Sequence, residues 1–210
     1  FAGALLPKKG FHTLVIAFNM VKKRIKEAEL IVCGSADLHY KSEQWLNQLP
    51  IPEDGSVQFR GKLPHPELAR ELSQAGLAVF PSSKKNWFEA FGKVSIEAQA
   101  CGCPAVVLDN RGLPETVVDG ITGRVCPADD PKVLADVIIE LLSNPDRLKG
   151  MGAEAVKHVQ KNFLWEQTLK PLKEIIEQGV KVNSLKRQIT YAGRLSHLVL
   201  EKASARITRK

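Results

Sequence analysis

Short apolar stretches alternate along this chain with longer amphipathic segments, and the alternation predicts strands separated by helices. The apolar stretches show no polarity at every second residue, which is typical of strands buried on both faces of a parallel sheet. Glycine or proline follows most of them and marks the end of each strand. The expected strands are Glu29–Cys33, Val57–Arg60, Leu77–Phe80, Ala105–Leu108 and Gly123–Cys126.

The segments between the strands are expected to be helical, and the last two begin at a proline. Proline suits the first helical turn because the N–H that it lacks would have no partner there. These two helices are Pro131–Leu142 and Pro145–Asn162; the others expected are His12–Glu27, Tyr40–Leu49, Pro66–Ala75, one that follows Gly92 and a short one from Pro114. The order predicts an α/β fold whose parallel sheet has helices on both faces and binds ligands beyond the carboxyl ends of its strands.

Loops that contain glycine fall repeatedly at that rim of the predicted sheet. Glycine allows the backbone to approach a ligand closely, so these loops are candidate binding segments. They are Gly3–Gly10, Gly34-Ser35, Gly61, Glu89–Gly92 and Gly112. No G-x-G-x-x-G pattern follows the first expected strand, which argues against an ordinary dinucleotide-binding domain.

Two glutamates, Glu89 and Glu97, lie eight positions apart on either side of Gly92. The helix that follows Gly92 has unpaired N–H groups and a positive dipole end at its start, and both suit a phosphate. Glu97 has apolar neighbours on its helix face, so its carboxylate requires hydrogen-bond donors such as a ribose diol. A core ion pair, or a pair with Lys93 four positions earlier, is the structural alternative.

The composition fits a soluble globular domain. Of the 210 residues, 44% are apolar and 25% charged, and no apolar run approaches the roughly 18 residues of a membrane-spanning helix. The chain starts at Phe1 near the end of what reads as a strand, so we expect a piece of a longer protein with a truncated first strand. The four cysteines lack metal-site spacing and no Asp-x-Asp pair occurs, so we expect reduced thiols, a cytoplasmic protein and no metal.

The positive charge is concentrated at the C-terminal end of the chain. The net charge is +7, and residues 179–210 hold eight Lys and Arg residues against the single acid Glu201. Apolar residues recur there at helical spacing, which predicts a basic helical tail. The tail is expected to be solvated or to cross to another domain, with peripheral contact to an anionic membrane as the alternative. No motif favours nucleic-acid binding.

Several motifs in a fixed order resemble the C-terminal, donor-binding domain of a GT-B glycosyltransferase of the retaining group 1, also called family 4. The resemblance covers residues 1–178 and leaves 179–210 as the tail. It implies a Rossmann-like sheet that forms the C-terminal half of the GT-B fold. The motifs are G-A-L-L-P-K-K-G at Gly3–Gly10, the strands that end at Gly34 and Gly61, A-V-F-P-S at Ala78–Ser82, E-x7-E at Glu89 and Glu97, E-A-x-A-C-G-x-P at Glu97–Pro104, G-x-P-E at Gly112–Glu115 and D-G-x-T-G at Asp119–Gly123.

The resemblance implies transfer of a sugar from a UDP-, GDP- or ADP-sugar without a cofactor. Lys9 would bind the diphosphate and, with Glu89, carry the catalysis. Glu97 would bind the ribose, and backbone around Gly61 would line the base. The remaining donor contacts would come from Gly3, Ala90, Phe91, Gly92 and Lys93. A glycan or lipid-linked acceptor would be bound mainly by a missing N-terminal domain, so the fragment alone is expected to be inactive.

One position departs from the family pattern, because Ala4 stands where an arginine is usual. Loss of one such charge from a catalytic site costs about 3–4 kcal/mol. Compensation is expected from Lys8, Lys84, Lys85 or Lys93. Two rival interpretations remain: a binding domain without turnover, and another GT-B enzyme such as a sugar-nucleotide epimerase.

Overall fold

The computed structural model of the chain describes residues 1–36, 42–83, 89–127 and 129–181. It divides into a unit over Phe1–Phe163 and a second unit that begins at Leu164, and each is described by itself. The basic tail, the start of the helix expected from Tyr40, and Lys84 and Lys85 lie outside the described residues. The functional boundary expected at residue 178 stays a prediction.

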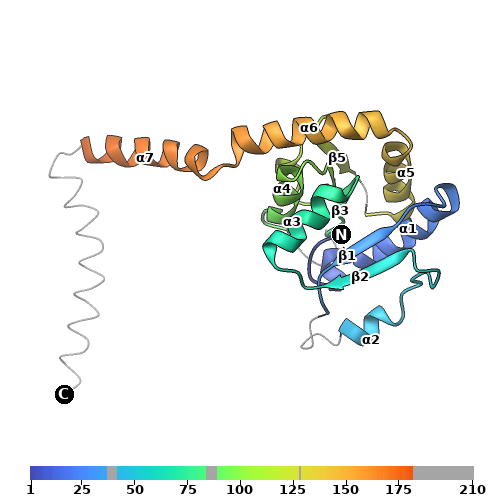
Figure 1. Cartoon of the computed structure of the whole chain (residues 1–210). Coiled ribbons are helices and arrows are strands. Elements are labelled where there is room, and N and C mark those ends of the chain that lie inside the picture. Colours follow the sequence, from blue (N-terminus) through green and yellow to red (C-terminus); the bar gives the residue numbers. More distant parts are fainter. Residues whose placement is uncertain (37–41, 84–88, 128, 182–210) are drawn as a thin grey trace, which may run out of the picture. The chain divides into compact units, whose positions relative to one another are not determined.

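Five parallel strands form the centre of the first unit, which confirms the predicted α/β class (Figure 1). One pair consists of β1 (Leu30–Cys33) and β2 (Val57–Gly61). The other three pair in the order β3 (Ala78–Phe80), β4 (Ala105–Leu108) and β5 (Gly123–Cys126). The N-terminal segment joins β1 through parallel bridges from Ala2 to Cys33 and from Leu5 to Ala36.

Seven helices occur among the described residues, five of them close to the ranges expected from the sequence. The helices are α1 (Phe11–Arg24), α2 (Ser42–Leu46), α3 (His65–Gln74), α4 (Lys93–Ala100), α5 (Pro131–Leu142), α6 (Pro145–Asn162) and α7 (Trp165–Lys181), with 3-10 turns η1 (Pro7–Lys9) and η3 (Pro114–Thr116). The Asp130 side chain caps α5 by accepting hydrogen bonds from the N–H groups of Lys132 and Val133, as expected for a helix with proline in its first turn.

The helix α1 ends three residues earlier than expected. The prediction continued it to Glu27, whereas the last helical residue is Arg24. The backbone leaves the helical conformation at Ile25, and the Lys22 Nζ donates to the carbonyl oxygens of Lys26 at 2.5 Å and of Ala28 at 3.1 Å. These bonds satisfy carbonyl groups of the following turn without further helix.

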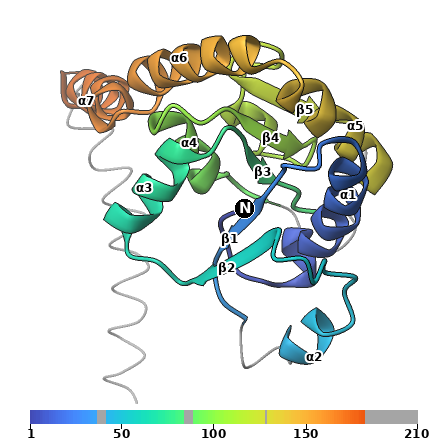
Figure 2. The same ribbon diagram turned by 45° about the vertical axis from the view of Figure 1, so that its right-hand side comes forward.

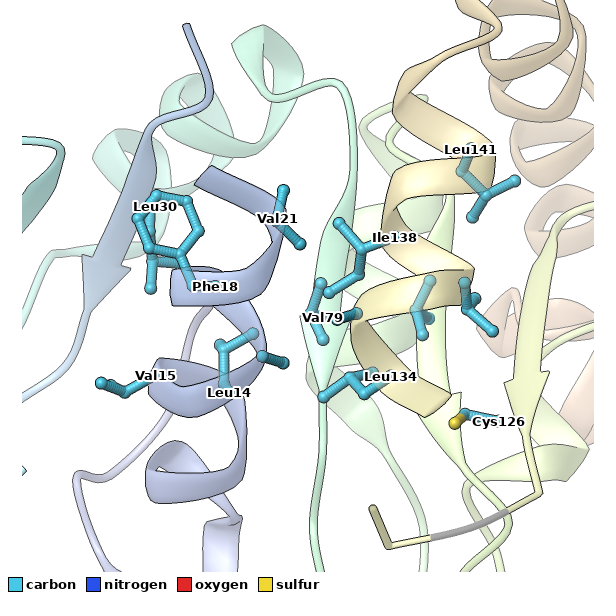
Figure 3. Close-up of a cluster of buried hydrophobic side chains, with 14 of the residues drawn as sticks. Leu14, Val15, Phe18, Val21, Leu30, Val79, Cys126, Leu134, Ile138 and Leu141 are labelled. Carbon is cyan, nitrogen blue, oxygen red and sulfur yellow. The ribbon is translucent and has the colours of Figure 1, made fainter. Parts of the chain in front are cut away.

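Helices cover both faces of the strands, and β4 shows why the sheet must be buried on each side (Figure 2). All four residues of β4 are buried, but alternate ones enter different clusters because side chains of a strand point to opposite faces. Val106 and Leu108 pack in the cluster that contains α1 and α5, and Ala105 and Val107 pack with Ala98 of α4. Figure 3 shows the first cluster, where side chains of α1 and α5 meet around Val79 of β3.

Glycine allows two of the rim loops to touch. Gly34 has a φ of 157°, and a Cβ atom at this position would lie 1.8 Å from the carbonyl oxygen of Gly3. The loop after β1 therefore lies directly against the N-terminal loop. This contact brings two of the predicted binding segments together.

The four cysteines are free thiols, and three of them are buried. Burial raises the pKa of the Cys103 thiol to about 12, so this group is an apolar packing residue at neutral pH. No helix among the described residues is long and apolar enough to cross a bilayer.

Candidate functional site

An ion pair joins the two residues that the sequence singled out for catalysis. Lys9, at the end of η1, places its Nζ 2.5 Å from Oε2 of Glu89, and the hydroxyl of Ser82 donates to the same oxygen at 3.1 Å. The side chains are 29% and 14% exposed, so the pair is only partly screened by water. The sequence predicted both residues but not their contact, and it did not predict Ser82.

This pair borders a cavity of about 250 Å³ at the carboxyl ends of the strands. The helix α4 begins here, with Gly92 at its N-cap and no side chain that caps it. A Cβ atom at position 92 would lie 2.5 Å from Cδ2 of Leu113, so the Leu113 side chain packs closely against this turn. We call this space the central cavity; its polar lining includes Lys9, Ser82, Glu89, Lys93 and Ser95.

A second hollow of about 490 Å³ adjoins the central cavity, since both are lined by Gly3, Lys93 and Val94. Glu97 is half-buried and lines this second hollow, while its binding of a ribose stays a prediction. Among the described residues Glu97 forms no ion pair with Lys93, so that alternative is not realised. We call this space the Glu97 hollow; Ala4, Ser35, Lys62 and His65 also line it.

A third hollow of about 520 Å³ shares Glu89 with the central cavity. Its walls are the loops that follow β3 and β4. The N–H of Gly112 donates to the carbonyl oxygen of Glu89 at 3.1 Å, which joins the two loops. We call this space the Arg111 hollow; its lining residues are Glu89, Ala90, Arg111, Gly112 and Glu115.

Arg111 is a residue of the site that sequence reasoning missed. It has a φ of 52°, in the left-handed region that residues other than glycine rarely adopt. Its position directly before the G-x-P-E segment was the available signal.

Buried amide side chains hold these loops in place. Asn110 donates through Nδ2 to the carbonyl oxygen of Ser82 at 3.0 Å, which ties the loop after β4 to the loop after β3. Gln99 of α4 donates through Nε2 to the carbonyl oxygen of Thr116 at 2.6 Å. Both residues are fully buried, where unpaired polar groups are costly, so these bonds fix the relative positions of the rim loops.

Of the residues predicted to bind the donor, most border the three connected spaces. Gly3, Lys9, Glu89, Phe91, Gly92 and Lys93 line the central cavity, Ala90 the Arg111 hollow, and Glu97 the Glu97 hollow. Gly61 has a left-handed φ of 68°, and its carbonyl oxygen accepts the N–H of Gly34 beside the Glu97 hollow. Of the candidate compensating cations, Lys93 lines the central cavity, whereas Lys84 and Lys85 lie outside the described residues.

Comparisons with known proteins agree on one family. The family model for glycosyl transferases group 1 matches residues 1–158. The chain is 33% identical over 165 residues to the GDP-mannose-dependent monoacylated alpha-(1-6)-phosphatidylinositol monomannoside mannosyltransferase of Corynebacterium glutamicum. That alignment covers 77% of this chain and 42% of the relative, so the chain spans less than half of that protein's length.

Two solved structures show the same fold. HepE of Anabaena in complex with UDP superimposes with a TM-score of 0.72 at 22% identity, over 84% of this chain and 47% of that one. The C-terminal domain of LpcC, a group 1 family protein from Francisella tularensis, gives a TM-score of 0.65 at 21% identity. This match covers 78% of the chain and 84% of the LpcC domain.

Proposed function

Because the chain belongs to the glycosyl transferases of group 1 and has the fold of their C-terminal domain, we propose that it binds a nucleotide-sugar whose sugar the complete enzyme transfers with retention. The observation that carries this proposal is the pair of Lys9 and Glu89 in the central cavity, beside the uncapped start of α4. A cation and a helix N-terminus at one cavity suit a diphosphate.

The three connected spaces would hold the donor in order. The Glu97 hollow would take the nucleoside, with the Glu97 carboxylate accepting hydrogen bonds from the ribose hydroxyls and backbone near Gly61 facing the base. The central cavity would take the diphosphate. Glu89, with backbone groups of Ala90 and Phe91, would contact the sugar.

The chemistry that this arrangement supports is charge stabilisation. Departure of the nucleoside diphosphate builds negative charge on the phosphates while the sugar acquires oxocarbenium character. Lys9 and the N–H groups at the start of α4 would stabilise the leaving diphosphate. Glu89 would stabilise the cationic sugar or orient a hydroxyl group, and Lys93 is a second cation at the same cavity in place of the arginine that Ala4 replaces.

Names of relatives support the substrate classes. One relative is GDP-mannose-dependent and acts on a phosphatidylinositol monomannoside, and another, from Corynebacterium efficiens, is a D-inositol 3-phosphate glycosyltransferase. HepE was solved with UDP. We therefore propose a UDP- or GDP-hexose as donor, with an ADP-sugar as the third candidate, and a glycan or lipid-linked acceptor that an N-terminal domain binds. The enzyme would act in the cytoplasm or at the cytoplasmic face of a membrane, and the chain alone would not transfer sugar.

Calorimetric titration of the chain with UDP, GDP and ADP tests the donor site. We expect one diphosphate to bind and Glu97→Ala to weaken that binding at least tenfold, the loss of one or two hydrogen bonds to a charged group. Failure of the unmodified chain to bind any of the three would overturn the proposed site. In the complete enzyme, Glu89→Gln should abolish transfer without loss of nucleotide affinity; full activity of that variant would remove Glu89 from the mechanism.

Ala4 motivates a second candidate function, a binding domain without turnover. An epimerase on the same fold is a further alternative. Incubation of the complete protein with the nucleotide-sugar identified by calorimetry separates the three. A glycosylated acceptor supports transfer, an altered sugar-nucleotide supports epimerisation, and an unchanged donor supports binding alone.

A further inference from the structure

Arg111 is held in an unfavourable backbone conformation by its neighbours. It is the only non-glycine residue with a positive φ among residues 1–36, 42–83, 89–127 and 129–181. Its neighbour Gly112 donates its N–H to the Glu89 carbonyl, and a Cβ atom at position 112 would lie 2.0 Å from the Ala90 carbonyl oxygen. The loop after β4 therefore packs directly against the loop after β3, and the N–H of Leu113 donates to the Asn110 carbonyl across Arg111 at 3.2 Å, so both contacts hold this turn. Strain that tertiary contacts maintain in this way is a feature of functional sites.

The Arg111 hollow is next to the residue proposed to contact the sugar. The Glu97 hollow and the central cavity share Gly3, Lys93 and Val94, and the central cavity and the Arg111 hollow share Glu89. The Arg111 hollow shares no lining residue with the Glu97 hollow. With the nucleoside at Glu97 and the diphosphate at Lys9, a sugar that contacts Glu89 would border the Arg111 hollow.

We propose that Arg111 is a specificity-determining residue that binds hydroxyl groups of the transferred sugar, an assignment that rests on the proposed function. A guanidinium group presents planar N–H donors that can bind two neighbouring oxygens at once. Glu89 and Glu115 border the same hollow, so its lining includes acidic residues beside the arginine. This mixture suits a neutral polyhydroxylated ring better than a second anion, which the two carboxylates would repel.

The left-handed backbone conformation of Arg111 allows a test that separates an arginine retained for sugar binding from one retained for stability. Glycine adopts a left-handed conformation without steric cost, so Arg111→Gly relieves the strain that the side chain imposes. If the arginine is retained for the sugar, this variant should unfold at a temperature no lower than the unmodified chain. An arginine retained for stability would give a clear decrease.

The experiment measures the affinity that the sugar adds. The chain is titrated with UDP, GDP and ADP, and then with UDP-glucose, GDP-mannose and ADP-glucose, to obtain the ratio of the dissociation constants of the diphosphate and its sugar. We expect the unmodified chain to bind the nucleotide-sugar more tightly than the diphosphate. Arg111→Ala and Arg111→Gly should each reduce this ratio of dissociation constants about fivefold or more, while the affinity for the diphosphate changes less than about twofold. Arg147→Ala is the matched control, because Arg147 pairs with Glu140 and lines none of the three spaces.

Three outcomes would overturn the inference. They are no gain from the sugar in the unmodified chain, an unchanged gain in both variants, or an equal loss of diphosphate and nucleotide-sugar affinity. If the unmodified chain binds a diphosphate and one of these results appears, the proposed function still stands. An unmodified chain that binds no diphosphate overturns the proposed function and this inference together.

Discussion

Replacement of Glu89 by glutamine is expected to strengthen diphosphate binding, although it removes a residue of the proposed catalytic pair. Oε2 of Glu89 lies 2.5 Å from the Lys9 Nζ. A phosphate oxygen bound to the same Nζ at about 2.8 Å would lie roughly 5 Å from the carboxylate if the two oxygens take opposite sides of the ammonium group. In the complex the carboxylate therefore repels the ligand that the lysine attracts.

The size of this repulsion follows from the distance. Two unit charges roughly 5 Å apart repel by about 0.8 kcal/mol at the dielectric constant of water and by about 1.6 kcal/mol at half that value. The pair is only partly exposed, so both values are relevant. Glu89→Gln should then tighten diphosphate binding by roughly 4- to 15-fold.

Calorimetry on the chain at low and high salt measures the effect. The gain should shrink at high salt, because screening reduces the repulsion. Glu115→Gln is the matched control: it is the same isosteric change at an exposed glutamate that borders the Arg111 hollow but not the central cavity. A gain of equal size in this control would refute the reasoning. Diphosphate binding weakened more than about threefold in Glu89→Gln would also refute it and would indicate that Glu89 stabilises the phosphate site.

Two further predictions concern Lys9 and His158. Lys9→Met should weaken diphosphate binding about 10- to 100-fold in the same titration, since one charge-assisted hydrogen bond contributes about 1.5–3 kcal/mol, and an affinity within threefold of the unmodified chain would contradict its role. Burial lowers the pKa of His158 below its usual value, and the ring packs against Phe163. The unfolded chain then binds more protons below about pH 6.5, so stability is full above that pH and falls as the pH drops through the folded-state pKa. Urea unfolding at pH 7 and pH 5 should show this loss in the unmodified chain and a smaller loss in His158→Gln; equal losses would contradict it.

The strands were predictable because the signal for each is local. Most are short apolar segments that end near a glycine, a proline or an aspartate, as expected for strands buried on both faces. β2 is the exception, because none of its residues is buried and its polar residues alternate with Val57 and Phe59. All five expected strands are present within one residue of their predicted bounds. The end of α1 was less predictable, because helix ends carry weaker local signals than strands in this chain.

The sequence indicated which residues belong to the candidate site, but it did not indicate which of them contact one another. The spacing of Glu89 and Glu97 around Gly92 indicated a phosphate at a helix start, and the structure places all three residues at connected spaces. The ion pair of Lys9 and Glu89 joins residues eighty positions apart, so it depends on how two rim loops come together. No pattern within either loop contains that information.

Arg111 shows the same limit at the level of the backbone. An arginine in a loop has no local signal for a left-handed conformation, which sequence reasoning assigns to glycine or asparagine. The N–H of Leu113 donates to the Asn110 carbonyl across this turn, and Gly112 binds the Glu89 carbonyl and packs against Ala90. The turn that contains Arg111 is thus attached to the loop that carries the proposed catalytic glutamate. If the function proposed for this rim is correct, a substitution of Gly112 should disturb diphosphate binding and sugar discrimination together, whereas a change at Arg111 should alter discrimination alone.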